Sequence, residues 1–192
     1  MSAPIKISYS LANLLLGGGA IPPQNVADIF HDGCLSLYGY PYGTPARTPP
    51  ADANAGIPLN GDNGIHLTNL QDVSGYLTFN AATGAVMLKD PTADWTGNID
   101  PAGVYASGGP YGGPPADLTA AKYVVTFFRV QLANAPVDNV ATDTAANTTL
   151  PRIQGLVSAQ DGGAGVLATA IVDQGAQQVI DEFRIALPLA TP

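Results

Sequence analysis

The feature that most constrains the fold is a series of short β-branched and aromatic runs, separated by segments rich in Gly, Pro, Asn and Asp. Turn formers are abundant, with Gly at 22 and Pro at 17 of the 192 positions. A βαβ fold needs helical patterns of roughly 10–15 residues between its strands, and we find none in the sequence. We therefore predict an all-β fold, a β-sandwich or jelly roll of about 7–9 short strands with long Gly/Pro-rich loops and an N-terminal arm.

The strongest predicted strand covers residues 122–132 and is β-branched or aromatic at most positions. Because large side chains fall on both of its faces, we expect this strand to lie in the centre of a sheet. A hairpin is predicted around the turn 80–84, and a short helix at 26–30. The other predicted strands cover residues 34–40, 65–68, 76–79, 85–89, 152–158, 166–172 and 178–187.

Residues 1–20 are predicted to form the N-terminal arm of a β-sandwich domain that spans residues 21–192. The arm alternates as a strand and then places leucines at helical spacing, with Ser10 as the expected N-cap and the glycines at 17–19 as the helix end. We expect such an apolar segment to dock, either on its own domain or on a neighbour's. The residues expected to make these contacts are Ile5, Ile7, Leu11, Leu14 and Leu15.

Three segments rich in turn formers are predicted to be long surface loops, at residues 41–58, 103–115 and 134–149. Tyrosines are frequent in or beside the first two of these loops. A tyrosine ring offers apolar area and a hydroxyl, which suits protein contacts and sugar stacking, but the same rings could equally hold the loops on the domain. The candidate interaction residues of this kind are Tyr38, Tyr40, Tyr42, Tyr105 and Tyr111.

The charge pattern and the short apolar runs argue against two classes of partner. The chain carries 15 acidic and 7 basic side chains, and the basic residues do not cluster as a phosphate-binding stripe requires, so we expect no nucleic-acid partner. The apolar run at 11–16 is too short for a membrane span or a secretory signal, so we expect neither. The single cysteine, Cys34, has apolar neighbours and is expected to be a buried, inert thiol in a reducing compartment.

We find no residue pattern that predicts catalysis or a bound cofactor. Two distant histidines, His31 and His66, with one cysteine do not make a zinc-ligand set. The segment 60–64 lacks the spacing and the distal Glu of a calcium loop. Neither a G-x-S-x-G motif nor a phosphate-binding P-loop is present. We therefore expect no metal, no cofactor and no enzymatic activity.

Several segments resemble a pattern found in small structural proteins of tailed bacteriophages. In that pattern a short helix ends in a Phe–polar–Gly–Gly turn, a strand reading L-x-I-Y-S-G follows, and then Q-P-A-S-A-D-A-A. This chain departs from the pattern with Cys34 at the second Gly and with an insertion at residues 40–48. The resembling segments are 26–39 (VADIFHDGCLSLYG), 49–56 (PPADANAG), 77–84 (LTFNAATG), 94–97 (DWTG), 128–130 (FRV), 153–157 (IQGLV) and 180–188 (IDEFRIALP).

The resemblance implies a β-rich virion component without catalytic residues, assembled in the host cytoplasm. The first hypothesis is a capsid cement or decoration protein that binds the major capsid protein from outside, as a trimer or dimer. The second is a tail, tail-fibre or baseplate component in which Tyr38, Tyr40 and Tyr42 meet a host glycan. The third, from another class, is a carbohydrate-active enzyme built on a jelly roll, which hydrolysis of a polysaccharide by the pure protein would reveal.

Overall fold

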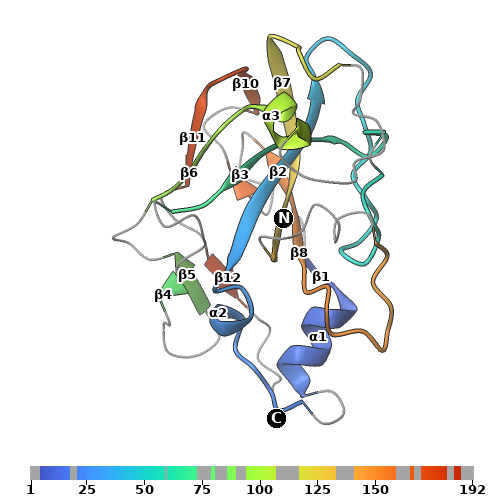
Figure 1. The fold of residues 1–192 in the computed structure, drawn as a ribbon, viewed down its shortest axis with the longest axis vertical. Helices are drawn as coiled ribbons and strands as arrows, with labels where there is room; N and C mark the ends of the chain where they lie inside the picture. The colour runs from blue at the N-terminus through green and yellow to red at the C-terminus, as the bar shows by residue number, and fades with distance from the viewer. Residues whose placement is uncertain are drawn as a thin grey trace.

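The structure, a computed structural model, is mostly β-sheet, and its strands pair antiparallel with one exception among the described residues (Figure 1). The predicted all-β class is confirmed at this level. The structure describes residues 5–17, 21–58, 60–72, 79–80, 86–89, 94–106, 117–132, 141–158, 165–166, 170–180 and 184–186.

The main sheet is built around one long strand, β7 (Lys122–Leu132), which occupies the predicted residues. Strand β7 pairs along one edge with β2, while β8 and β10 share its other edge, so the prediction of a central strand is confirmed. The sheet runs in the order β1 (Lys6–Ile7), β8 (Ile153–Ser158), β7, β2 (Gly33–Pro41) and β3 (Ile65–Leu70), with β10 (Ile171–Asp173) on β7 and β9 (Gly165–Val166) parallel to β8.

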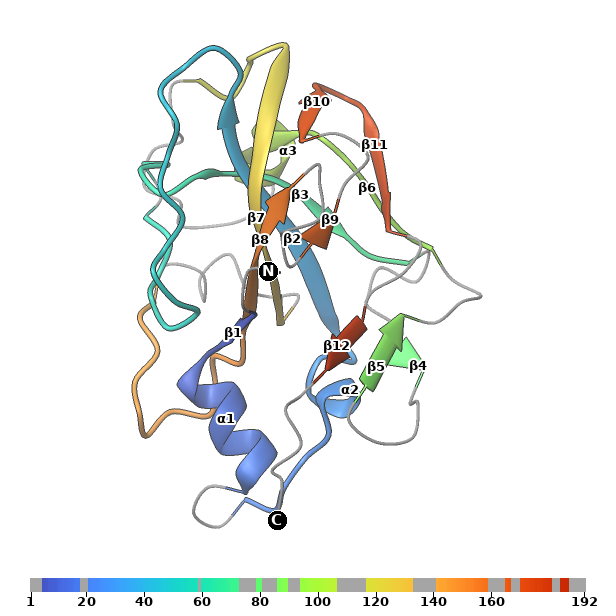
Figure 2. The same cartoon turned by 180° about the vertical axis from the view of Figure 1, so that it is seen from behind.

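Two smaller sheets complete the described strands. One pairs β6 (Trp95–Asn98) with β11 (Gln177–Ile180), and the other has the order β12 (Arg184–Ala186), β5 (Val86–Lys89) and β4 (Phe79–Asn80). Strands β4 and β5 form the predicted hairpin, although residues 76–78 of the expected strand lie outside the described residues. Figure 2 shows this sheet at the same end of the molecule as the first two helices.

Two sequence predictions about strands near the C-terminus are wrong. Residues 166–172 do not form one strand, because β9 pairs with β8 whereas β10 pairs with β7. Residues 178–187 are likewise divided between β11 and β12, which belong to different sheets. The physical reason is the same in both places: the chain changes its pairing partner within the run, and the pairing partner depends on residues that are distant in the sequence.

The three helices in the described part of the chain are short. Helix α1 (Tyr9–Leu16) has Ser8 as its N-cap, because the Ser8 hydroxyl accepts from the N–H of Leu11, so the expected cap at Ser10 is wrong. Gly17 ends α1 with φ 74°, as predicted. Helix α2 (Val26–Ile29) was predicted, whereas α3 (Pro101–Ala106) was not. No helix in the described part of the chain is long and apolar enough to cross a membrane.

Alternation along the strands gives the main sheet two different faces. One face is apolar and forms the main core with side chains from α1, α2 and β6. The other face is largely polar and is covered in part by residues 41–58. The strand residues of the apolar face include Leu35, Leu37, Leu67, Leu70, Phe128, Val130 and Ile153, and those of the polar face include Ser36, His66, Asn69, Arg129, Gln131 and Gln154.

Two irregularities in the ladder fix which side chains share the polar face. The β2–β3 register shifts so that Thr68 is opposite Leu37 while His66 is opposite Tyr38, which places His66 on the same face as Asn69. The β2–β7 register shifts after Tyr38. At the next residue, Gly39, an added Cβ would overlap the carbonyl oxygen of Val124, so only glycine fits here.

Candidate functional site

Arg129 lies at the centre of the polar face and is 0% exposed. Its neighbours in the register are Ser36 on β2 and Gln154 on β8. The Nε atom donates to Gln154 Oε1 at 2.8 Å, and Nη2 donates to the Ala55 carbonyl at 2.7 Å. Burial lowers the pKa of Arg129 to about 10, which leaves the guanidinium charged at neutral pH. A buried charge is therefore held by neutral oxygens.

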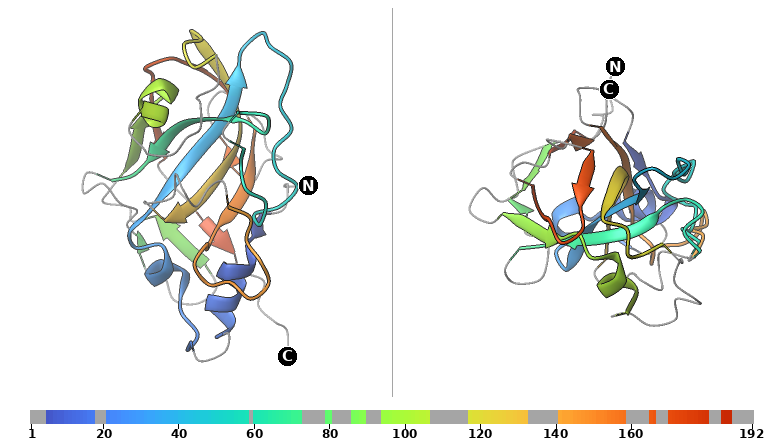
Figure 3. Two further views of the ribbon diagram at one scale, coloured as in Figure 1. Left: turned by 45° about the vertical axis from the view of Figure 1, so that its right-hand side comes forward. Right: turned by 90° about the horizontal axis from the view of Figure 1, so that it is seen from above.

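Four side chains donate hydrogen bonds to carbonyl groups of residues 50–55. Three of these side chains belong to strands β1, β7 and β8, and the fourth belongs to the residue just before β8. This segment is thereby fixed along the sheet, as the left view of Figure 3 shows for the whole of residues 41–58. The expected loop does lack helix and strand after Pro41, but it is not simply a surface loop, because Ala53 and Ile57 are buried. The donors and their acceptor carbonyls are Lys6 to Ala51, Arg129 to Ala55, Arg152 to Asn54 and Gln154 to Pro50.

A second polar cluster, on β2, β3 and β7, contains the cysteine and a histidine. Asn69 Oδ1 accepts from Ser36 Oγ at 2.6 Å and lies 2.8 Å from His66 Nε2. Gln131 Nε2 donates to the same Ser36 hydroxyl at 2.8 Å. Burial raises the pKa of Cys34 to about 11 and lowers the pKa of His66 to about 4. At neutral pH the thiol is protonated and the imidazole is neutral, so this cluster offers no thiolate nucleophile.

The N-terminal arm docks on its own chain in this structure. The Ser8 N–H donates to the Arg152 carbonyl at 3.0 Å. The Ser8 hydroxyl accepts from the Arg152 N–H at 3.0 Å and donates to the Leu150 carbonyl at 2.9 Å. Both the N–H and the hydroxyl of Ser10 donate to the carboxylate of Asp143. Figure 1 shows α1 beside the orange segment 141–151 that supplies these acceptors.

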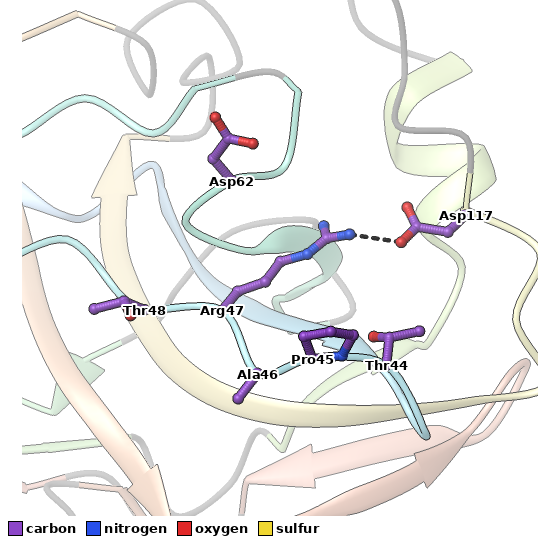
Figure 4. Close-up of a pocket in the computed structure, with 7 residues that line it drawn as sticks. All are labelled: Thr44, Pro45, Ala46, Arg47, Thr48, Asp62 and Asp117. Carbon is purple, nitrogen blue, oxygen red and sulfur yellow. Dashed lines mark hydrogen bonds and ion pairs between the residues drawn. The ribbon is translucent and has the colours of Figure 1, made fainter.

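A polar pocket of about 540 Å³ lies between residues 44–48, Asp62 and Asp117 (Figure 4). Arg47 spans it, with Nη2 donating to Asp117 Oδ2 at 2.5 Å and Nη1 donating to the Gly61 carbonyl at 2.9 Å. Arg47 and Asp117 form an ion pair with each other, so neither is available as a separate acid or base. The pocket therefore offers hydrogen-bonding groups to a ligand. The described residues contain no group of three or more His, Cys, Asp or Glu side chains placed to hold a metal ion.

The structure separates the predicted contact residues of the arm by burial. Leu11 and Leu14 belong to the chain's own core, and Ile5 and Leu15 pack partly buried against it. Ile7 is 38% exposed. The folded chain therefore leaves Ile7 accessible at the surface but buries Leu11 and Leu14.

The predicted tyrosines divide in the same way. Tyr38 and Tyr40 lie in β2 and not in a loop, and the Tyr38 ring is buried and stacked against His66 and Phe127. Tyr105 lies in α3, where it is buried and its hydroxyl accepts from the His66 N–H at 3.4 Å. Tyr42, the residue after β2, is 58% exposed. Tyr111 lies outside the described residues.

Sequence reasoning missed two exposed apolar side chains in the arm. Leu16 is 81% exposed at the C-terminus of α1, and Tyr9 is 48% exposed at its start. A helical projection from the correct N-cap, Ser8, places Tyr9 and Leu16 on the face opposite Leu11 and Leu14. A helical projection could therefore have identified these two exposed side chains from the sequence.

Comparison of the chain with models of protein families, with curated proteins and with solved structures found no match.

Proposed function

We propose that this chain is a structural protein of a bacteriophage virion, and within the virion a capsid cement protein that binds the assembled lattice of the major capsid protein. The proposal joins the motif resemblance given above to the placement of exposed apolar side chains. We also propose that the described sheets belong to a β-sandwich, in which β6 and β11 oppose the apolar face of the main sheet. Trp95 and Ile180 support this arrangement, because both contact the cluster that contains Leu35 and Phe128.

The observation that carries the proposal is that the three most exposed large apolar side chains of the described residues, Tyr9, Leu16 and Tyr42, lie towards opposite ends of an elongated molecule. Tyr9 and Leu16 belong to α1 at the lower end in Figure 1, and Tyr42 directly follows β2, which ends near the top. A protein that bridges two neighbouring subunits needs two separated contact surfaces, and apolar side chains, aromatic ones above all, form the buried centre of such contacts.

The body between the two ends is suited to carry load. Strand β2 runs most of the distance, and the segment 50–55, which lies over β7 and β8, is bound through its carbonyl groups to Arg129, Arg152 and Gln154. Cementing is then a mass-action effect, because a ligand that binds only the assembled lattice lowers the free energy of that state. A rigid spacer holds the two contact surfaces at a fixed separation, so that both can bind neighbouring subunits at the same time.

Co-sedimentation with virus particles that lack the chain tests the proposal. We expect Leu16→Asp and Tyr42→Asp each to weaken binding at least about tenfold. Each variant places a carboxylate in one of the two contact surfaces, where binding to the lattice would bury its charge. Val179→Asp is the matched control, since Val179 is an exposed apolar residue on β11, outside both α1 and the turn that follows β2. Absence of the chain from purified virions, or wild-type binding by both end variants, would overturn the proposal.

A second candidate is a tail or baseplate component that binds a host glycan. It is favoured by one observation: Tyr42 lies in the turn closed by the hydrogen bond from Thr44 N to the Pro41 carbonyl, and Thr44 lines the polar pocket. An exposed ring beside hydrogen-bonding groups is a typical sugar-binding arrangement. Copy number per virion separates the two candidates, because a lattice protein is present in hundreds of copies and a baseplate protein in few. Loss of glycan binding in Tyr42→Ala, with particle binding retained, would favour the second.

A further inference from the structure

The polar pocket shown in Figure 4 has the size and the lining of a binding site for a small group. It is lined by the segment 44–48 together with Asp62 and Asp117. Its volume of about 540 Å³ lies within the usual range of ligand pockets. Within the segment, Pro45 and Ala46 contribute apolar surface. The pocket therefore suits a ligand that is apolar along its length and polar at its tip.

Arg47 is not arranged to bind an external anion. Its Nη2 atom donates to Asp117 Oδ2, and its Nη1 atom donates to the Gly61 carbonyl. Both terminal nitrogens are therefore engaged within the chain, and Asp117 balances the charge of the guanidinium. A phosphate or carboxylate ligand would have to displace Asp117, and it would also be repelled by the charge of Asp62.

Asp62 gives the pocket one excess negative charge. Across the described residues Asp62 forms no ion pair, and its side chain accepts a hydrogen bond from Asn60 Nδ2 at 2.7 Å through Oδ2. Asp62 Oδ1 and Asp117 Oδ1 accept no hydrogen bond from any residue that the structure describes. The chain as a whole is also acidic, with a net charge of −8. Two open carboxylate oxygens in an acidic pocket favour a cationic ligand.

We propose that this pocket binds a basic side chain of a partner protein, either the ammonium of a lysine or the guanidinium of an arginine. The charged tip binds the open oxygens of the two carboxylates, because it carries hydrogen-bond donors and no acceptor. The methylene stem lies against Pro45 and Ala46, as the stems of long basic side chains commonly do on apolar surface.

This inference rests on the proposed function, under which the partner that supplies the basic side chain is the major capsid protein. The pocket adjoins the contact assigned to Tyr42, since Thr44 closes the turn after Tyr42 and also lines the pocket. The exposed ring contributes apolar area, whereas the pocket selects one charged residue of the lattice. An ion pair of this kind also makes binding weaker as the salt concentration rises.

NMR titration of the ¹⁵N-labelled full-length chain tests the pocket without a virus particle. The probes are the Nα-acetyl amides of lysine and arginine, and the uncharged control is the Nα-acetyl amide of norleucine. We expect the basic amides to bind with dissociation constants on the order of 1–10 mM and to shift the signals of residues 44–48 and 60–64. Absence of these shifts, or equal shifts with the control, overturns the proposal. Binding of methyl glucoside but of neither basic amide overturns it in favour of a glycan.

A charge reversal tests the role of Asp62. Asp62→Lys replaces the excess carboxylate with an ammonium, and Asp32→Lys makes the same change at an exposed position before β2. We expect Asp62→Lys to weaken binding of the basic amides at least about tenfold and Asp32→Lys to leave it unchanged. Circular dichroism checks that both variants are folded. Unchanged binding by folded Asp62→Lys overturns the proposal.

Co-sedimentation with particles separates this inference from the proposed function. If the wild-type chain binds particles, we expect Asp62→Lys to bind at least about tenfold more weakly, and undiminished binding overturns the assignment of the basic side chain to the lattice. If the wild-type chain ignores particles while the basic amides bind its pocket, the proposed function fails and the pocket retains its ligand class.

Discussion

Ser10 and Asp143, 133 residues apart in the sequence, form two buried hydrogen bonds that fix the first turn of α1 to the segment before β8. The Ser10 N–H donates to Oδ2 at 2.6 Å and its hydroxyl donates to Oδ1 at 2.7 Å. The same hydroxyl accepts from the Leu150 N–H at 3.1 Å. One carboxylate therefore links the first turn of α1 to the segment that precedes β8.

Replacing this carboxylate should destabilise the chain. We expect Asp143→Ala to lower the free energy of unfolding by about 2–3 kcal/mol, because two buried donors of Ser10 lose a charged acceptor. Urea unfolding followed by circular dichroism measures the change. Thr144→Ala, at the exposed neighbouring position, is the control and should change stability by less than about 0.5 kcal/mol. Equal stability of the two variants would show that the Ser10–Asp143 pair contributes nothing.

Arg129 should not be replaceable by lysine. The guanidinium binds Gln154 and the Ala55 carbonyl at the same time, and a lysine ammonium lacks this fork geometry. We expect Arg129→Lys to cost about 2–4 kcal/mol in chemical unfolding, because a buried charge is left incompletely hydrogen-bonded. By contrast, Lys122→Gln removes an exposed ion pair with Asp173 and should cost less than about 1 kcal/mol. The reverse order would contradict the role assigned to Arg129.

His66 should make stability depend on pH. Burial lowers its pKa from 6.5 to about 4, so between these values the unfolded chain binds a proton that the folded chain does not. Stability therefore falls as the pH drops from about 6.5 to about 4, by a total on the order of 3 kcal/mol from this residue. In His66→Gln this part of the pH dependence should vanish. Parallel unfolding curves for both proteins at several pH values provide the measurement, and an unchanged slope in the variant would contradict the assignment.

Cys34 should be inert in the folded chain. Burial raises the pKa of its thiol to about 11, so at pH 8 almost no thiolate is present and the sulfur is also inaccessible. We expect labelling by iodoacetamide to require unfolding, with complete labelling in denaturant. Mass spectrometry of timed samples measures the rate. Rapid labelling of the native protein would show that the β2–β7 region opens far more readily than its buried ladder implies.

Much of the main sheet could be predicted because its strands carry local signals. Strand β7 is β-branched or aromatic at most of its positions, and β2 begins at the glycine of the Asp32-Gly33 pair. Strand β6 was missed because it is short and contains Gly97, which is needed only because the Asn69 carbonyl lies against it in the fold. Helix α3 was missed among glycines and prolines, although Asp100 followed by Pro101 is a recognisable helix start.

The candidate site was less predictable than the fold. Hydrophobicity identified the arm, and the structure shows which of its side chains the domain itself buries. No sequence pattern marks Arg129 or Arg152 as buried, because their acceptors are main-chain oxygens of a segment about 75–100 positions away. Pairs such as Ser10 and Asp143 are equally invisible to local analysis, since neither residue type signals a specific distant partner.

The hydrogen bonds from Arg129, Arg152 and Gln154 to carbonyl oxygens have an evolutionary consequence. Every amino acid supplies the same carbonyl, so substitutions along residues 50–55 leave these bonds in place as long as the backbone follows its path. Descendants of a common ancestor are therefore expected to retain the three donors and the buried Ala53, while the exposed positions of the covering segment diverge. In this segment, two such proteins would superimpose closely and yet show little similarity when their amino-acid sequences are aligned.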